Sequence, residues 1–214
     1  MEARDSKFEI GALLAETISL LVSNWWRVTL TVAVLTGIGT WMDLRGDLRS
    51  SNILFTFVAM GFQIWITDSV LTRTATKQPD VRSGRGFGVI LVSQLGILLG
   101  LILLIIPGVI VFVRWSMALP IALSSGAGVT DSMKRSWQRS EGHFWPIFCL
   151  LMLVYVPLLG AVVVAGVLAE QAPVLSSIVM NAILTLGLAA GWFASLATFL
   201  AGEPRTAVLQ EVFA

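Results

Sequence analysis

Long apolar runs, separated by short polar segments, dominate the hydrophobic pattern of this chain. Several runs approach or exceed the 18 or so consecutive apolar residues that one bilayer crossing requires. We therefore predict an all-α fold, a polytopic integral membrane helix bundle with about six transmembrane helices and additional interfacial amphipathic helices. The predicted spans are 26–42, 52–71, 88–106, 109–123, 145–168 and 174–200. The chain 1–214 is predicted to be a single membrane domain, with the bundle at 26–200 and a tail at 201–214.

The span count depends on the apolar run from Gly88 to Leu123. As one straight helix this run would be roughly 54 Å long, whereas the hydrocarbon core of a bilayer is about 30 Å thick. Pro107 lacks a backbone donor and Gly108 turns easily, so we predict a helical hairpin that reverses at these two residues. The alternative is a single kinked span followed by a helix that lies in the membrane interface.

Two further segments have the pattern of amphipathic helices. In 6–23 the polar residues recur at helical spacing on one narrow face, which suits an interfacial helix or a helix packed on its own bundle. In 130–142 apolar and basic residues occupy opposite edges, with Thr130 as the expected N-cap and Gly142 as the expected stop. The second of these helices is predicted to lie on the cytoplasmic side.

Composition and charge place the protein in a membrane and give it an orientation. Only 13% of the residues are charged, against about 25% in soluble chains. A net charge of +1 argues against a nucleic-acid partner. Basic residues in short loops mark the cytoplasmic side, and six spans would place all three basic segments, 4–27, 73–85 and 134–139, on one side. We predict a multi-pass protein of the cytoplasmic (inner) membrane of a bacterium, with both termini in the cytoplasm.

Four polar residues inside the spans, Asp68, Arg114, Gln63 and Asn181, are candidate intramembrane site residues. A charge within a span costs several kcal/mol unless it is paired or reaches the interface, and Asp68 could pair with Arg114. A substrate or ion site is one interpretation of Arg114; structural pairing or snorkelling is the one we favour. For Gln63, Gln94 and Asn181 we favour interhelical hydrogen bonds over a binding site.

The remaining chemistry-bearing residues predict no catalytic, metal or cofactor site. Lys134, Arg135 and Arg139 are candidate lipid-facing basic residues, although topology-setting charges would explain them equally well. His143 lacks metal-site spacing beside it, and Cys149, the only cysteine, is expected to be a core residue. No phosphate-binding glycine loop, H-E-x-x-H or G-x-S-x-G motif occurs.

Three consecutive motifs resemble a known family. They are Ile105-Ile-Pro-Gly-Val-Ile-Val, Arg114-Trp-Ser-Met-Ala-Leu-Pro and Met133-Lys-Arg-Ser-Trp-Gln-Arg-Ser-Glu-Gly-His-Phe-Trp. Over about 88–150 the chain is similar to bacterial inner-membrane proteins of the glycerophosphoryl diester phosphodiesterase membrane-domain family and to their uncharacterised relatives. The resemblance implies a multi-spanning α-helical protein. The family name derives from members fused to a soluble phosphodiesterase domain, which we do not expect here, because a single histidine cannot supply its acid–base pair.

Three functional hypotheses follow from these observations. The leading one is a non-enzymatic membrane protein that acts through contacts with membrane lipid, a protein partner or a second copy of itself. The alternative is a small transporter or channel, in which the four polar intramembrane residues would line one water-accessible cavity. A membrane enzyme acting on lipid is the third, and only the region of Asp68 and Arg114 offers ionisable residues for it.

Overall fold

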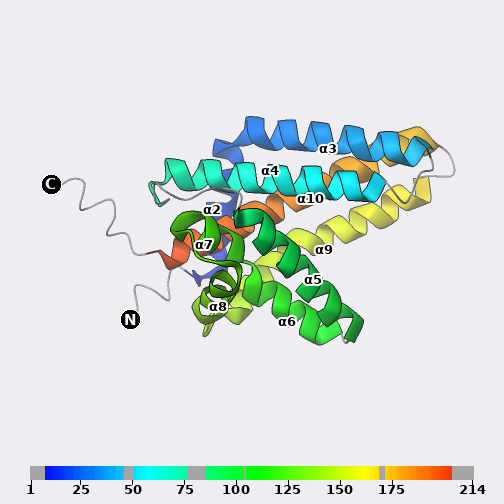
Figure 1. Ribbon diagram of the computed structural model, residues 1–214. Helices are drawn as coiled ribbons and strands as arrows, with labels where there is room; N and C mark the ends of the chain where they lie inside the picture. Colours follow the sequence, from blue (N-terminus) through cyan, green and yellow to red (C-terminus); the bar gives the residue numbers. More distant parts are fainter. Residues whose placement is uncertain (1–7, 46–50, 77–84, 104, 169–171, 204–214) are drawn as a thin grey trace.

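The computed structural model describes residues 8–45, 51–76, 85–103, 105–168 and 172–203, and all regular secondary structure within them is helical (Figure 1). The α-helices are α2 (Ile10–Ser23), α3 (Trp25–Arg45), α4 (Ser51–Arg73), α5 (Arg85–Leu103), α6 (Ile105–Trp115), α7 (Ala118–Ser125), α8 (Val129–Arg139), α9 (Phe144–Leu168) and α10 (Pro173–Gly202). The predicted all-α fold is confirmed. Most of the predicted tail, 204–214, lies outside the described residues, as do 1–7 of the N-terminal segment.

The length and composition of the helices fit an integral membrane protein. Four helices of the described chain are long and apolar enough to cross a bilayer: Ile53–Arg73, Ile105–Ser125, Phe144–Val163 and Pro173–Gly202. A fifth span results if α2 and α3, which meet at 78°, are taken as one broken span. Six spans are therefore not confirmed. The apolar stretch of α5, Gly86–Ile102, is shorter than 18 residues, and α3 is diluted by threonines and Arg27.

The chain reverses direction between α5 and α6. A Cβ atom added to Gly100 would lie 2.8 Å from the Cα atom of Gly108, although eight residues of continuous helix would separate them by about 12 Å. The predicted hairpin is therefore present, but the predicted position of its turn is wrong. α5 ends at Leu103, and Pro107 is the third residue of α6. Proline is tolerated there because the first backbone N–H groups of a helix have no intrahelical acceptor.

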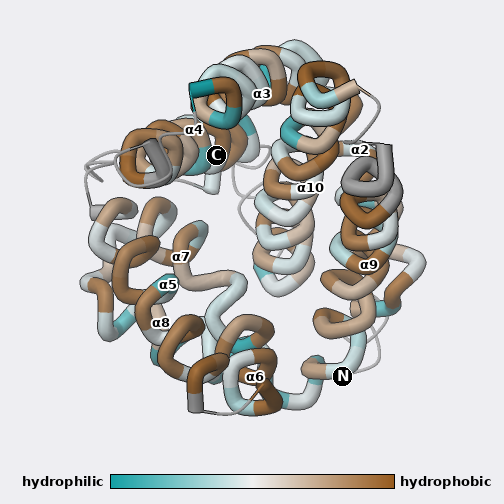
Figure 2. The backbone as a smooth tube through the Cα atoms, turned by 90° about the vertical axis from the view of Figure 1, so that its right-hand side faces the viewer, coloured by the Kyte–Doolittle hydropathy of each residue, from teal (hydrophilic) through white to brown (hydrophobic). Residues whose placement is uncertain are grey.

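Helix α10 forms the centre of the bundle. It packs against α2, α3, α4, α7 and α9, and the tube view shows it between α3 and α9 (Figure 2). Its second half is buried and rich in small residues: Gly187, Ala189, Gly191, Ala194 and Ala197. Small side chains let neighbouring helices approach closely, which is the main source of packing energy between helices in a bilayer.

One end of the bundle, here called the basic end, contains the start of α3, the end of α4 and the amphipathic helices α2 and α8 (Figure 1). Helix α2 lies across this end and buries Leu13, Thr17 and Leu20, packing against α10 and α9. The opposite end, here called the far end, contains the end of α3 and the start of α10 (Figure 1).

Helix α8 is shorter than predicted. Its N-cap is Gly128 rather than Thr130, and it ends at Arg139, with Ser140 as the C-cap, rather than at Gly142. Gly142 follows in the left-handed region at φ 80°, which a glycine adopts without strain. Ser132 and Ser136 are buried on the inner face of α8, whereas Lys134 and Arg135 are exposed.

Candidate functional site

A pocket of about 430 Å³, here called the central pocket, lies within the bundle. It is bounded by α4, α5, α6, α9 and α10, with Ser116 and Leu119 from the α6–α7 segment. Its lining residues are Gln63, Val89, Ile90, Ser93, Gln94, Ile97, Phe112, Trp115, Ser116, Leu119, Leu151, Met152, Tyr155, Leu188, Gly191, Trp192 and Ser195. Most of these side chains are apolar, so the pocket suits an apolar ligand with a few polar groups.

Several polar side chains line this pocket and make no hydrogen bond with any described residue, and the three largest come from three different helices. They are Gln63 of α4, Gln94 of α5 and Tyr155 of α9. Gln63 and Tyr155 are partly buried, whereas Gln94 is exposed. Inside a bilayer a polar group without a hydrogen-bond partner costs several kcal/mol. A bound molecule with hydrogen-bonding groups of its own would satisfy them.

Two glycines leave room for aromatic side chains that line the central pocket. A Cβ atom at Gly191 would overlap the hydroxyl group of Tyr155, and one at Gly96 would overlap the ring of Trp115. The Tyr155 ring also makes an edge-on contact with Phe112, with 5.8 Å between the ring centroids. Packing therefore fixes both aromatic rings where the glycines leave room for them.

A second pocket of about 440 Å³, here called the lateral pocket, lies between α4 and α5 and adjoins the central pocket. The two pockets share Gln63, Ile90, Gln94, Leu188 and Trp192. The lateral pocket is also lined by Leu91, Leu95 and Leu98, which are exposed on the outward face of α5. An apolar chain could therefore pass from the outer surface of the bundle to the two glutamines.

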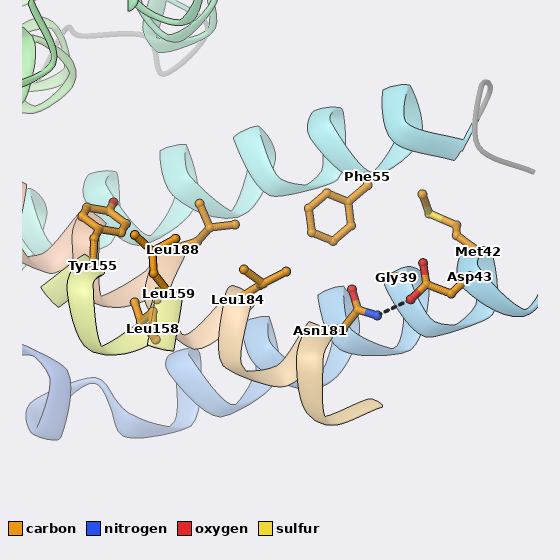
Figure 3. A pocket seen from close by; sticks show the side chains of 11 residues that line it. Gly39, Met42, Asp43, Phe55, Tyr155, Leu158, Leu159, Asn181, Leu184 and Leu188 are labelled. Carbon is orange, nitrogen blue, oxygen red and sulfur yellow. Dashed lines mark hydrogen bonds between the residues drawn. The ribbon is translucent and has the colours of Figure 1, made fainter. Parts of the chain in front are cut away.

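A third pocket of about 400 Å³, here called the Asp43 pocket, lies toward the far end (Figure 3). It shares Tyr155 and Leu188 with the central pocket. Asp43 of α3 accepts hydrogen bonds from the side chains of Asn181, at 2.8 Å, and Ser177. Asn181 is therefore an interhelical hydrogen-bond donor between α10 and α3 as well as a lining residue.

Arg114, a candidate in the sequence, lies in a different place. Its Nη1 donates to the backbone oxygen of Trp137 at 3.5 Å and to the hydroxyl of Ser140 at 3.3 Å. Its guanidinium also lies 5.3 Å from the ring centroid of Trp137. A further hydrogen bond joins α8 to this residue, because the hydroxyl of Ser136 donates to the backbone oxygen of Arg114 at 2.7 Å. Arg114 therefore holds the C-terminus of α8, where a cation also interacts favourably with the helix dipole.

The hydrogen bonds of Arg114 go to α8 and not to Asp68, so the pairing considered from the sequence is not formed. Asp68 lies near the basic end of α4 and lines none of the three pockets. Of the basic residues on α8, Arg139 pairs at 2.7 Å with Glu203, the C-cap residue of α10. Among the described residues no group of three or more His, Cys, Asp or Glu side chains is placed to hold a metal ion.

The structure thus brings Gln63 and Asn181 to adjoining pockets and separates them from Arg114. The sequence alone did not single out Tyr155 or Trp192, because an aromatic residue in an apolar helix carries no signal of the direction in which it points. Gln94 stands out in the sequence as an amide within an apolar run, but that pattern is equally typical of a hydrogen bond between packed helices.

One known protein family matches this chain. The family described as the membrane domain of glycerophosphoryl diester phosphodiesterase matches residues 87–194, half of the chain. The chain belongs to this family. No curated protein and no solved structure matches it. The matched residues run from α5 into α10, and all residues of the central pocket except Gln63 and Ser195 lie among them.

Proposed function

We propose that this member of the membrane-domain family is a non-enzymatic protein of the bacterial cytoplasmic membrane that binds a membrane lipid. One acyl chain would enter between α4 and α5 through the lateral pocket and occupy the central pocket. The observation that carries this proposal is the set of hydrogen-bonding groups without partners among the described residues, Gln63, Gln94 and Tyr155, within a mostly apolar pocket. Ester or hydroxyl groups of a lipid would bond them.

The dimensions and contents of the central pocket support binding. Its volume of about 430 Å³ lies within the range of roughly 300–1,000 Å³ that small-molecule sites occupy. Tyr155 is its only lining residue of a commonly ionising type, because no Asp, Glu, His, Lys, Arg or Cys lines it. An acid–base mechanism requires a donor and an acceptor of suitable pKa. The pocket therefore favours binding over hydrolysis.

The lipid assignment is tested by replacing Gln94 with alanine. Removing one hydrogen-bonding group to the ligand is expected to reduce the lipid retained on the purified protein by about five- to tenfold. Retained lipid is measured by native mass spectrometry after gentle detergent extraction. Gln138→Ala is the matched control, because Gln138 is exposed on α8 and lines none of the pockets. Equal retention by both variants would remove the glutamine from the site.

We also propose six spans, formed by α3, α4, α5, the α6–α7 segment, α9 and α10, with both termini in the cytoplasm. The concentration of Arg27, Arg73, Lys134 and Arg135 at the basic end supports this orientation, since basic residues are retained on the cytoplasmic side. A compartment-sensitive reporter is expected to report outside when placed at Ile105 and inside when placed at Gln138. Reports from the same side would mean that the α6–α7 segment does not cross.

A second candidate, lipid translocation, is favoured by one observation. Leu188 lines all three pockets, so they adjoin one another along α10 between Gln63 and Asn181 at the far end. An assay of a fluorescent phospholipid in proteoliposomes distinguishes lipid binding from lipid translocation. Binding alone leaves a fluorescent phospholipid in its original leaflet, whereas translocation exchanges it between leaflets.

A further inference from the structure

Two arginines from different helices converge on one side-chain oxygen at the corner between α2 and α3. Arg27 donates to Oδ1 of Asn24 at 2.6 Å, and Arg73, at the end of α4, donates to the same atom at 3.5 Å. The amide nitrogen of Asn24 donates to the backbone oxygen of Leu20 at 2.9 Å, which fixes the oxygen toward the arginines. These three residues, Asn24, Arg27 and Arg73, are here called the arginine corner.

The arginine corner has more positive charge than its described surroundings neutralise. No ion pair joins either corner arginine to a carboxylate of the described residues, in contrast to the pair that Arg139 makes with Glu203. Arg27 is only 8% exposed, and its buried Nε atom has no hydrogen-bond partner. Burying a cation without a counter-charge is costly, and a second cation beside it adds repulsion.

Aromatic rings offset part of this cost but do not complete the site. The Arg27 guanidinium lies 4.9 Å from the ring centroid of Trp26 and 5.6 Å from that of Trp65. Cation–π contacts are weaker than a charge-assisted hydrogen bond to an anion, and neither ring completes the hydrogen bonding of the Nε–H of Arg27. An anion with several oxygen atoms would accept from both guanidinium groups and would neutralise the pair.

The position of the corner indicates the source of that anion. It lies at the basic end beside Trp25, which is 67% exposed, and Trp26, which is 43% exposed. Exposed tryptophans at helix ends mark the headgroup level of a bilayer. We propose that Arg27 and Arg73 bind the phosphate group of an anionic phospholipid at this level. This site is separate from the central pocket and lies outside the residues that match the family, so it does not depend on the proposed function.

The test is lipid retention by the purified full-length chain, measured by native mass spectrometry with phosphatidylglycerol or phosphatidylcholine supplied. We expect preferential retention of phosphatidylglycerol, and we expect Arg73→Gln and Arg27→Gln each to reduce it by about tenfold. Arg73 is exposed, so its variant is expected to fold even if Arg27→Gln does not. Repeating the measurement in the Gln94→Ala background counts lipid at the corner separately from lipid in the central pocket.

Arg45→Gln is the matched control, because Arg45 lies over the ring of Trp41 at 4.3 Å but at the far end of α3. Its phosphatidylglycerol retention should equal that of the parent. Unchanged retention in Arg73→Gln would overturn the proposal, and so would equal retention of the two lipids. Displacement of phosphatidylglycerol by excess inorganic phosphate would assign the site to a soluble anion and overturn the lipid assignment.

Discussion

Replacing Arg114 with methionine is expected to destabilise the protein by about 2–3 kcal/mol and to detach α8 from the bundle. The arginine donates to Trp137 and Ser140 at the C-terminus of α8 and lies over two aromatic rings, those of Trp137 and Phe144. Methionine retains much of the apolar stem but removes the charge and every donor. Thermal unfolding in detergent measures the loss, and thiol labelling of Ser132→Cys, a position that is buried in the parent, measures the detachment.

Two further variants separate the contributions of charge and geometry. Arg114→Lys keeps the charge near the α8 C-terminus but loses the planar fork, so an intermediate loss of stability is expected. Arg135→Met is the control on α8 itself, because Arg135 is exposed and its one hydrogen bond, to Ser125, is 3.5 Å long. If Arg114→Met unfolds at the same temperature as Arg135→Met, the anchoring of α8 by Arg114 is wrong.

Replacing Gln63 and Gln94 together with leucine is expected to have opposite effects on stability and on binding. An amide without a partner in an apolar setting costs about 1–3 kcal/mol, so the double variant should stabilise the ligand-free protein by about 1–2 kcal/mol. The same change removes the groups that bond the lipid, and lipid retention should fall to background. Unfolding of delipidated protein and native mass spectrometry of freshly extracted protein measure the two effects.

Asn181→Leu provides the contrast, because this amide has partners. It donates to Asp43 at 2.8 Å, and its loss would leave that carboxylate short of a donor within the Asp43 pocket. A Cβ atom at Gly39 would already overlap the Asn181 side chain, so the site also has little room for a different shape. Asn181→Leu should therefore destabilise the protein. Destabilisation by the Gln63 and Gln94 replacements as well would show that the glutamines are structural.

Hydrophobic periodicity was sufficient to locate the helices, because each apolar run in a bilayer must satisfy its own backbone hydrogen bonds. It was not sufficient to place the turn of the hairpin. Pro107 is unfavourable in the interior of a helix but tolerated in its first turn, and the pattern of apolar residues does not distinguish these positions. The span count depends on α3 and α5. Taken alone, α3 is too polar and the apolar stretch of α5 is too short to be identified as a membrane span.

The candidate residues were predictable as polar groups within apolar runs, but their partners were not. Arg114 meets residues that follow it by 23 and 26 positions, because α8 folds back onto α6. Arg27 and Arg73 meet at Asn24 only because α2 and α3 join at 78° and α4 ends beside that corner. Such contacts depend on tertiary packing, which local sequence periodicity does not specify.

The most direct test of lipid binding is photo-crosslinking in intact membranes from Leu188, which lines all three pockets. A photoactivatable leucine analogue at this position should form a defined adduct with a lipid acyl chain, and the adduct should disappear when Gln63 and Gln94 are replaced with leucine. The same analogue at Leu175, which is 61% exposed on α10, should capture bulk lipid with or without those replacements. Crosslinks from position 188 to neighbouring protein side chains alone would contradict lipid binding in the central pocket.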